Sequence, residues 1–544
     1  VSELLQAQLM QDININPVQP SVSATNLNIV TLGGPAAAGF NEFTPLFERN
    51  KTQFNASGFG GNNDTYGGEA AVSGVYDQFS YSLGAYSYNT DGWRPNNGLD
   101  QEVYNAFAQW AISPELNIQA EFRRRVSTEG DLAFNFDPDS YLDDKTVERE
   151  QDSTRVGLRY SPAPNTDFLF SYIYTKRDEK IEQFEILDPF TTLDINSKVN
   201  SKGSQIEAQN IYRTDRFNVI TGLSYNQVDD ENDDSLSLDD VDIGPIFVVD
   251  ETTKTELKNP HGYVYVNVST GDAVTWTLGA SYDDFNSGPI DEKTFSPKFG
   301  VRWDVTNTVQ LRAAALQVVK PALVNNRTIE PTQVAGFNQF FDDINATKSR
   351  LYGGALDWRV MSNLSTGAEA TWRYLDEPVL LDENGVDFEE RNEQRHRLYL
   401  YWTPLDQLSV SLEAVYDLFK SDKGVATEFD NLPEEVRTVS LPLSLRYFRP
   451  SGFFAGIAGT YVDQKVVRSE FSTQGQGSDN FFLVDAAIGY RLPKRYGILS
   501  LEVKNLFDKE FSYQDDSYRE FRDEPAIGPY FPDRTILGQI AINF

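Results

Sequence analysis

Arginines on predicted strands are the residues of this sequence with the clearest potential for binding chemistry. Seven of them fall on the polar faces of such strands: Arg123, Arg125, Arg155, Arg159, Arg312, Arg395 and Arg397. If these faces line the inside of a barrel, the guanidinium groups would attract anionic solutes or hold the acidic groups of an internal domain. The favoured alternative is ion pairing within the wall, to carboxylates such as Glu121, Glu413 or Glu502.

Carboxylates form a second group with possible binding chemistry. The acidic stretch 229–242 contains Asp229, Asp230, Asp233 and Asp234, and a similar group comprises Asp137, Asp139, Asp143 and Asp144. Calcium takes roughly six to eight oxygen ligands, so such loops can bind it. Both stretches lack the glycine and the terminal glutamate of the helix–loop–helix calcium pattern. A solvated outer loop, or one bridged to lipopolysaccharide by divalent ions, is therefore the favoured interpretation, and the first four aspartates remain weak calcium candidates.

The sequence contains few of the residue types that catalysis or cofactor binding would need. The chain has no cysteine and two histidines, which excludes zinc ribbons, iron–sulfur clusters, thiol nucleophiles and a tri-histidine site. We expect His261 at a junction of loop and strand with no serine motif beside it, and His396 on the apolar face of its strand near a membrane boundary. No glycine-rich phosphate loop is evident. The sequence predicts neither an enzyme nor a bound cofactor.

Charge and hydropathy exclude two further classes of protein. With 47 basic and 81 acidic residues the formal charge is −34, so binding of nucleic acid through a basic face is not expected. The mean hydropathy is −0.45, and no apolar run approaches the roughly 18 residues of a spanning helix. A helical membrane protein is therefore excluded.

The elements that carry these residues alternate with a period of two, as strands do. In the stretch 116–125 one face collects Leu116, Ile118, Ala120 and Phe122, and the other collects Asn117, Gln119, Glu121, Arg123 and Arg125. The same separation recurs at 274–282, 408–417 and 536–544. Because a helix would mix these faces, the sequence predicts an all-β protein.

Connection lengths distinguish a barrel from a soluble sandwich. Tight links such as 77–78, 113–115 and 270–272 alternate with long polar stretches at 127–151, 177–203, 229–257, 318–346, 375–391, 419–434, 464–479 and 507–533. Outer-membrane barrels have short periplasmic turns and long outer loops. We place about 22 strands, starting near 51, 67, 79, 101, 116, 152, 166, 204, 217, 258, 273, 293, 308, 347, 363, 392, 407, 435, 452, 480, 497 and 534. The expected fold is a transmembrane antiparallel β-barrel in the bacterial outer membrane.

Aromatic placement supports contact with lipid. Phe168, Phe170, Tyr172 and Tyr174 share one face, and further rings lie near predicted strand ends: Tyr88, Trp110, Tyr160, Tyr282, Trp402 and Tyr447. Such rings form the girdles of membrane barrels. The last residue, Phe544, lies on the apolar face, and an aromatic carboxy terminus resembles the signal that the barrel assembly machinery reads.

Two carboxy-terminal runs carry a family resemblance. The runs Val503-Lys504-Asn505-Leu506-Phe507-Asp508-Lys509-Glu510-Phe511 and Pro529-Tyr530-Phe531-Pro532-Asp533-Arg534-Thr535 resemble the closing signature of TonB-dependent receptors. The stretches 40–49 and 56–58 are similar to the barrel start of receptor-like proteins with extra periplasmic modules. The resemblance implies a 22-strand barrel, in agreement with the independent strand count.

Members of that family fold an amino-terminal plug inside the barrel, whereas only about 50 residues of this sequence precede the first predicted strand. We expect residues 1–50 to form a periplasmic or lumen segment before a barrel at 51–544, and 50 residues would fill about a quarter of the interior. We therefore expect a plug that is cleaved, missing from this sequence or supplied by another chain. The stretch 26–32 faintly resembles a TonB-contacting box, although any short β-prone stretch would look similar.

The leading hypothesis is an outer-membrane transport channel for a solute too large or too scarce for general porins. The alternative is a non-enzymatic barrel that anchors a surface or periplasmic assembly. Expected partners are outer-membrane lipid, lipopolysaccharide and the barrel assembly machinery, with TonB or a separate plug as further candidates and no nucleic acid.

Overall fold

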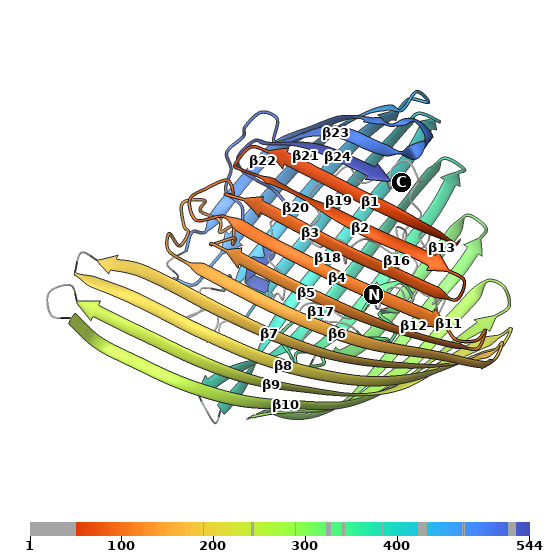
Figure 1. The fold of residues 1–544 in the computed structure, drawn as a ribbon, viewed down its shortest axis with the longest axis horizontal. Helices are drawn as coiled ribbons and strands as arrows, with labels where there is room; N and C mark the ends of the chain where they lie inside the picture. The colour runs from red at the N-terminus through yellow and green to blue at the C-terminus, as the bar shows by residue number, and fades with distance from the viewer. Residues whose placement is uncertain are drawn as a thin grey trace.

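The computed structural model describes residues 50–543, apart from 189, 241–243, 289, 323–327, 340–342, 383–384, 423–431, 471, 473 and 520–528. A sheet of 22 strands dominates these residues (Figure 1), and β14 and β15 form a separate two-stranded hairpin. Each strand of the sheet pairs antiparallel with the next along the chain, and β24 returns to pair with β1 from Asn55↔Asn543 to Gly61↔Leu537. The sheet is thus a closed barrel, and the expected count of about 22 strands is confirmed.

The barrel strands are β1 (Lys51–Gly61), β2 (Tyr66–Tyr76), β3 (Phe79–Thr90), β4 (Leu99–Ala111), β5 (Leu116–Glu129), β6 (Thr146–Ala163), β7 (Thr166–Asp188), β8 (Thr191–Arg213), β9 (Phe217–Asp240), β10 (Gly244–Thr270), β11 (Val274–Ser287), β12 (Ile290–Thr306), β13 (Val309–Val319), β16 (Lys348–Met361), β17 (Leu364–Asp382), β18 (Gly385–Leu405), β19 (Leu408–Ser421), β20 (Glu435–Phe448), β21 (Phe453–Val467), β22 (Gly477–Arg491), β23 (Gly497–Lys504) and β24 (Thr535–Asn543). The small hairpin is β14 (Gln333–Val334) with β15 (Phe337–Asn338), and the single-turn helices are η2 (Pro493–Arg495) and η3 (Asp516–Arg519). None of the helices among the described residues has the length and apolar character needed to cross a membrane.

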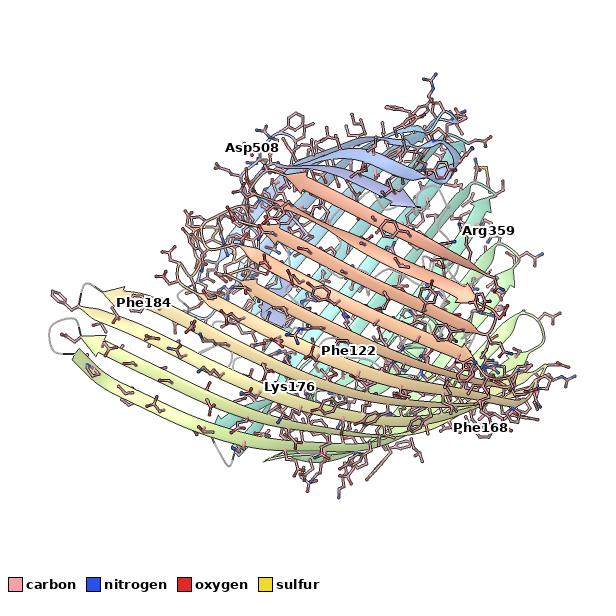
Figure 2. The ribbon with its side chains drawn as sticks, in the orientation of Figure 1. Phe122, Phe168, Lys176, Phe184, Arg359 and Asp508 are labelled. Atoms are coloured by element: carbon pink, nitrogen blue, oxygen red, sulfur yellow. The ribbon has the colours of Figure 1, made fainter. Side chains whose placement is uncertain are left out.

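The wall is apolar outside and polar inside, the reverse of a water-soluble protein. Phe122 and Phe168 project from the outer wall (Figure 2) and are exposed, whereas Gln101, Glu121 and Arg125 are buried on the inner side. Successive side chains of a strand point to opposite faces, so this separation follows directly from the period-two pattern. An outer wall of exposed leucine, valine and aromatic side chains suits lipid and not water.

An aromatic girdle follows the short-turn end of the barrel. The exposed rings beside these turns are Tyr76, Phe79, Trp110, Tyr160, Phe168, Tyr212, Phe217, Trp276, Trp303, Trp358, Trp402, Tyr447, Phe453, Tyr490 and Tyr496. Rings at this position sit at the boundary between acyl chains and water. The prediction that Tyr88 belongs to such a girdle is wrong, because this ring points inward and packs with Phe59 at a centroid distance of 5.9 Å.

Four strands continue far beyond the others at the loop end. The strands β7 to β10 have 23, 23, 24 and 27 residues, against 11 for β1, and Figure 1 shows them projecting together. The polar stretches 177–203 and 229–257 are therefore mostly strand and not loop, and 375–391 likewise lies mostly on β17 and β18, which corrects that expectation. Above the membrane both faces of a strand meet water, so the alternation that marks a strand disappears from the sequence.

The amino-terminal segment up to residue 49, with the stretches 26–32 and 40–49, lies outside the described residues, as does Phe544. The barrel itself begins at Lys51. The carboxy-terminal signature forms a corner after β23. There the Asn505 side chain donates to the Lys509 carbonyl at 2.9 Å and to the Phe531 carbonyl at 3.2 Å. This corner directs the chain into the closing strand.

A charge on the outer wall tests the contact with lipid. Leu223 on β9 is 72% exposed, and Leu223→Arg should destabilise the barrel in lipid vesicles by about 2–4 kcal/mol, since a cation near the bilayer centre costs this much. Denaturant unfolding of the vesicle-inserted barrel measures the loss, with Leu223→Met as the control. Equal stability of the two variants would contradict a lipid-facing wall.

Candidate functional site

The arginines predicted on β5 and β6 lie on the inner side of the wall, where carboxylates and amides surround them. Arg125 donates to the Gln151 side chain at 2.6 Å, and the Arg155 guanidinium lies 3.6 Å from Glu121. Arg159 forms an ion pair of 3.0 Å with Asp167. Arg123 points to the same side, two residues before Arg125 on β5, and is partly buried. These groups form a charged inner wall.

The later arginines are also on inward faces of their strands. Arg312 on β13 pairs with Asp357 at 2.8 Å and with Glu369 at 3.1 Å. Arg397 on β18 pairs with Glu413 at 2.7 Å, as the wall-pairing alternative requires. Arg395 has the same strand parity as Arg397 but is exposed, so this guanidinium faces open space inside the barrel.

A segment between β13 and β16 folds back into the barrel. Its hairpin β14–β15 turns at Ala335 and Gly336, which both have positive φ, 50° and 86°, the geometry of a type I′ turn. The tip meets glycines of the wall: a Cβ at Gly300 would lie 2.8 Å from Val334, and one at Gly353 would lie 2.5 Å from the Phe337 ring. The wall therefore lacks side chains at the places where the hairpin packs.

A buried ion cluster fastens this segment to β10, β11 and β12. Glu330 accepts a hydrogen bond from the His261 ring at 2.9 Å and lies 3.3 Å from the Lys298 ammonium. The other ring nitrogen of His261 pairs with Asp283 at 2.7 Å, and the Tyr265 hydroxyl also donates to Glu330. The side chains of Lys298 and Glu330 are 1% and 3% exposed, so each charge depends on its partners for compensation.

A second anchor lies next to this cluster, on β8. The Glu207 carboxylate accepts hydrogen bonds from the Thr328 hydroxyl at 2.9 Å, the Ile329 backbone N–H at 2.9 Å and the Tyr263 hydroxyl at 2.9 Å. The Gln209 side chain donates to the Ile329 carbonyl at 2.7 Å. Residues 328–330, which lead into the hairpin, are thus fixed to the wall.

The charge state of Glu330 follows from its neighbours. Burial alone raises the pKa of this carboxyl, but the Lys298 ammonium and the His261 ring outweigh burial and lower the pKa to about 2. A carboxyl with a lowered pKa contributes stability above its ordinary pKa, and the contribution is lost as the pH falls toward the lowered value. The cluster therefore holds the segment at neutral pH.

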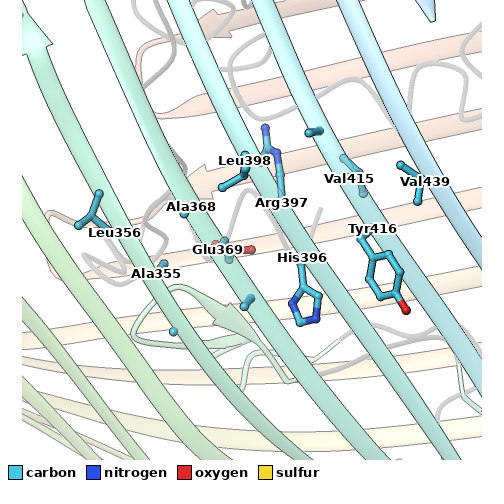
Figure 3. Close-up of a pocket in the computed structure, with 13 residues that line it drawn as sticks. Ala355, Leu356, Ala368, Glu369, His396, Arg397, Leu398, Val415, Tyr416 and Val439 are labelled. Carbon is cyan, nitrogen blue, oxygen red and sulfur yellow. The ribbon is translucent and has the colours of Figure 1, made fainter. Parts of the chain in front are cut away.

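The two histidines occupy different environments. His261 lies within β10 and not at a junction of loop and strand, which corrects the prediction; the strand begins earlier than the alternation indicated. His396 is on the outer face, where its ring stacks with Tyr416 at a centroid distance of 5.6 Å. Figure 3 shows the two side chains next to each other at a hollow of about 500 Å³ in the outer wall. Ala368, Ala370 and Ala414 leave room for this hollow.

The calcium candidates lie on β9 and not on a loop. Strand alternation places Asp229 and Asp233 on one face and Asp230 and Asp234 on the other, so the four carboxylates do not converge. Asp137, Asp139, Asp143 and Asp144 are exposed in the connection after β5. Within the part of the chain that the structure describes, no three histidine or carboxylate side chains gather as a metal site.

A further cavity lies at the loop end of the closing seam, where sequence reasoning indicated nothing. It has a volume of about 310 Å³. Its aromatic and polar walls comprise Trp93, Phe134, Tyr530, Phe531, Asn63, Asn97, Thr65, Thr90 and Lys504. Arg94 fixes the loop below by donating to the Ala133 carbonyl at 2.5 Å and pairing with Asp131 at 3.4 Å. Lys504, Tyr530 and Phe531 belong to the two carboxy-terminal runs that carry the family resemblance, but no pattern in the sequence marked them as the lining of a cavity.

Comparisons with known proteins agree with this architecture. A family model described as TonB dependent receptor-like, beta-barrel matches residues 39–506, and no curated protein sequence matches the chain. Among solved structures, the copper transporter OprC has a TM-score of 0.67 at 13% identity, over 92% of this chain and 81% of that chain.

A receptor and a transporter from two other bacteria are similar to the same degree. The siderophore receptor PiuA from Acinetobacter baumannii has a TM-score of 0.67 at 11% identity, over 91% of this chain and 82% of its own. The FrpB iron transporter from Neisseria meningitidis has a TM-score of 0.66 at 12% identity, over 93% and 83%. At such low sequence identities, the structural similarity shows that the fold is shared and no more.

Removal of the buried carboxylate tests the docking of the hairpin. Glu330→Ala leaves Lys298 buried without its anion, which should weaken docking by about 3–5 kcal/mol. The chain has no cysteine, so a single cysteine in place of the buried Val334 reports docking through its rate of maleimide labelling. We expect labelling at least ~10-fold faster when Glu330 is absent.

The matched control is a cysteine in place of Asn338, which is exposed at the same hairpin and should label equally fast in both backgrounds. Slow labelling at position 334 in the Glu330→Ala background would show that the ion cluster does not hold the hairpin.

Proposed function

The chain belongs to the TonB-dependent receptor-like β-barrel family, and from this membership we infer that its solute path runs along the charged inner wall. The protein is an outer-membrane transport barrel of the Gram-negative cell envelope. We propose that the infolded segment between β13 and β16 narrows this path. The observation that carries the proposal is the docking of the hairpin against Gly300 and Gly353 inside the barrel.

The kind of solute is suggested by the cavity at the closing seam. Its volume of about 310 Å³ lies at the lower end of the range for small-molecule sites. Aromatic rings of Trp93 and Phe531 offer stacking surfaces, while Asn63, Asn97 and Lys504 offer hydrogen bonds. We propose an organic solute that combines a flat apolar part with polar or anionic groups. The similar structures are a copper transporter, a siderophore receptor and an iron transporter.

We propose that partner proteins supply the energy for transport and seal the barrel. Members of this family work with TonB and a plug, and we propose that this barrel uses TonB and a plug as well. Lipid, lipopolysaccharide and the barrel assembly machinery are its further proposed partners. The family and the similar structures are transporters and receptors, and no catalytic step is part of the proposal. The anchoring alternative also stays a prediction; a stoichiometric partner that co-purifies in mild detergent would favour it.

Conductance of the purified barrel in planar bilayers tests the solute path. Replacing residues 331–339 by two glycines removes the hairpin from the interior, so single-channel conductance should rise severalfold. The control replaces residues 237–248, at the far tip of the projecting strands, by the same link and should leave conductance unchanged. The same conductance for the hairpin deletion and the control would contradict a path past the hairpin.

A further inference from the structure

In the described part of the chain, the projecting part of β10 has one edge that no other strand covers. Antiparallel pairing with β9 runs from Gly244↔Asp240 to Val268↔Phe217. Pairing with β11 begins only at Leu257↔Ser287. Among the described residues, 244–256 therefore pair with a strand on one side alone. The backbone N–H and C=O groups on the other side form an unpaired ladder, which we call the β10 edge.

The β10 edge carries an exposed apolar run. Ile246, Phe247, Val248 and Val249 are 55%, 55%, 51% and 37% exposed. In the regular part of this run, Phe247 and Val249 point to one face of the strand and Val248 points to the other. Val249 lies about 20 residues from the turn end of β10, on the order of 45 Å at ordinary barrel tilt, whereas the apolar band of a barrel is roughly 25 Å tall. Lipid therefore does not account for this run.

The usual protection of an edge strand is confined to the tip. Pro245 and a register irregularity between Pro245 and Phe247 interrupt the pairing there, and both features discourage strand addition. From Phe247 onward the register with β9 is regular. A long, regular and apolar edge is a template on which an extended peptide can add as a further strand.

Charge determines which peptide fits. The neighbouring stretch 229–240 of β9 holds seven carboxylates, and the β10 edge itself carries Asp250, Glu251 and Glu256. Its one lysine, Lys254, already pairs with Glu231 at 2.6 Å. A second copy of this chain would bring the same acidic strands into contact, and like charges directly opposite one another are destabilising. A basic segment would instead meet complementary charge at Asp250, Glu251 and Glu256.

We propose that the β10 edge is a docking site for an extended, cationic segment of a partner protein, which adds to the sheet as one more strand. Alternating apolar residues of the partner pack on Ile246 to Val249, and its Lys or Arg side chains face the carboxylates. The site lies outside the barrel interior and does not depend on the solute path.

A peptide-binding experiment on the detergent-solubilised full chain tests the proposal. The probe is a fluorescent synthetic peptide of about 13 residues that alternates valine and lysine, and anisotropy reports binding. Phe247→Lys should weaken binding by at least ~10-fold, because it adds a cation and removes a ring from the edge. The matched control is Phe184→Lys, which changes an exposed ring of β7 on the same projecting sheet (Figure 2), and it should bind as the unmodified chain does.

Three outcomes would overturn the proposal. The first is equal binding by Phe247→Lys and the unmodified chain, and the second is equal binding of a peptide with the same charge whose valines are replaced by prolines. The third is a dimer in analytical ultracentrifugation that Phe247→Lys abolishes, which would assign the edge to a second copy. A disulfide between a cysteine at Val248 and a cysteine-bearing probe, formed in preference to one at Phe184, would support strand addition directly.

Discussion

Inside a bilayer no water can pair with an exposed backbone N–H or C=O group, and the rest of this structure depends on that constraint. Every strand must find a partner on both sides at membrane depth, so the sheet closes where β24 meets β1. At the loop end of this seam the Asn62 side chain donates to the Arg534 carbonyl at 2.7 Å and accepts from the Ile536 N–H at 2.8 Å. Closure then fixes which face of each strand meets lipid and which faces inward.

A barrel of this size encloses more space than its own wall side chains can fill, and the interior is organised by charge and by infolded connections. Wall arginines such as Arg155 and Arg312 lie beside carboxylates, because an uncompensated buried charge is costly. The segment between β13 and β16 is held by Glu330. Near the seam, Phe134 packs with Phe511 and Tyr513 at centroid distances of 5.9 and 6.0 Å.

The sequence predicted the barrel well because lipid imposes a strict period of two. The strands predicted near 79, 116, 217, 435 and 497 begin at those residues, and Trp402 and Tyr160 lie in the girdle as expected. Prediction failed where lipid no longer acts: the upper parts of β7 to β10 were read as loops, and Tyr88 was placed outside. The ion cluster was not predictable, because His261 and Glu330 are 69 positions apart and Lys298 and Glu330 are 32 apart. A local pattern in the sequence cannot indicate a contact between residues so far apart along the chain.

Tryptophan fluorescence in bilayers tests the central claim that lipid covers the outer wall. The chain has seven tryptophans. Six are exposed on that wall, namely Trp110, Trp276, Trp303, Trp358, Trp372 and Trp402, whereas Trp93 packs inside against Phe134. In vesicles of brominated phospholipid most of the emission should be quenched, and the remainder should disappear on Trp93→Phe substitution. Emission as strong in brominated as in ordinary lipid would contradict the account.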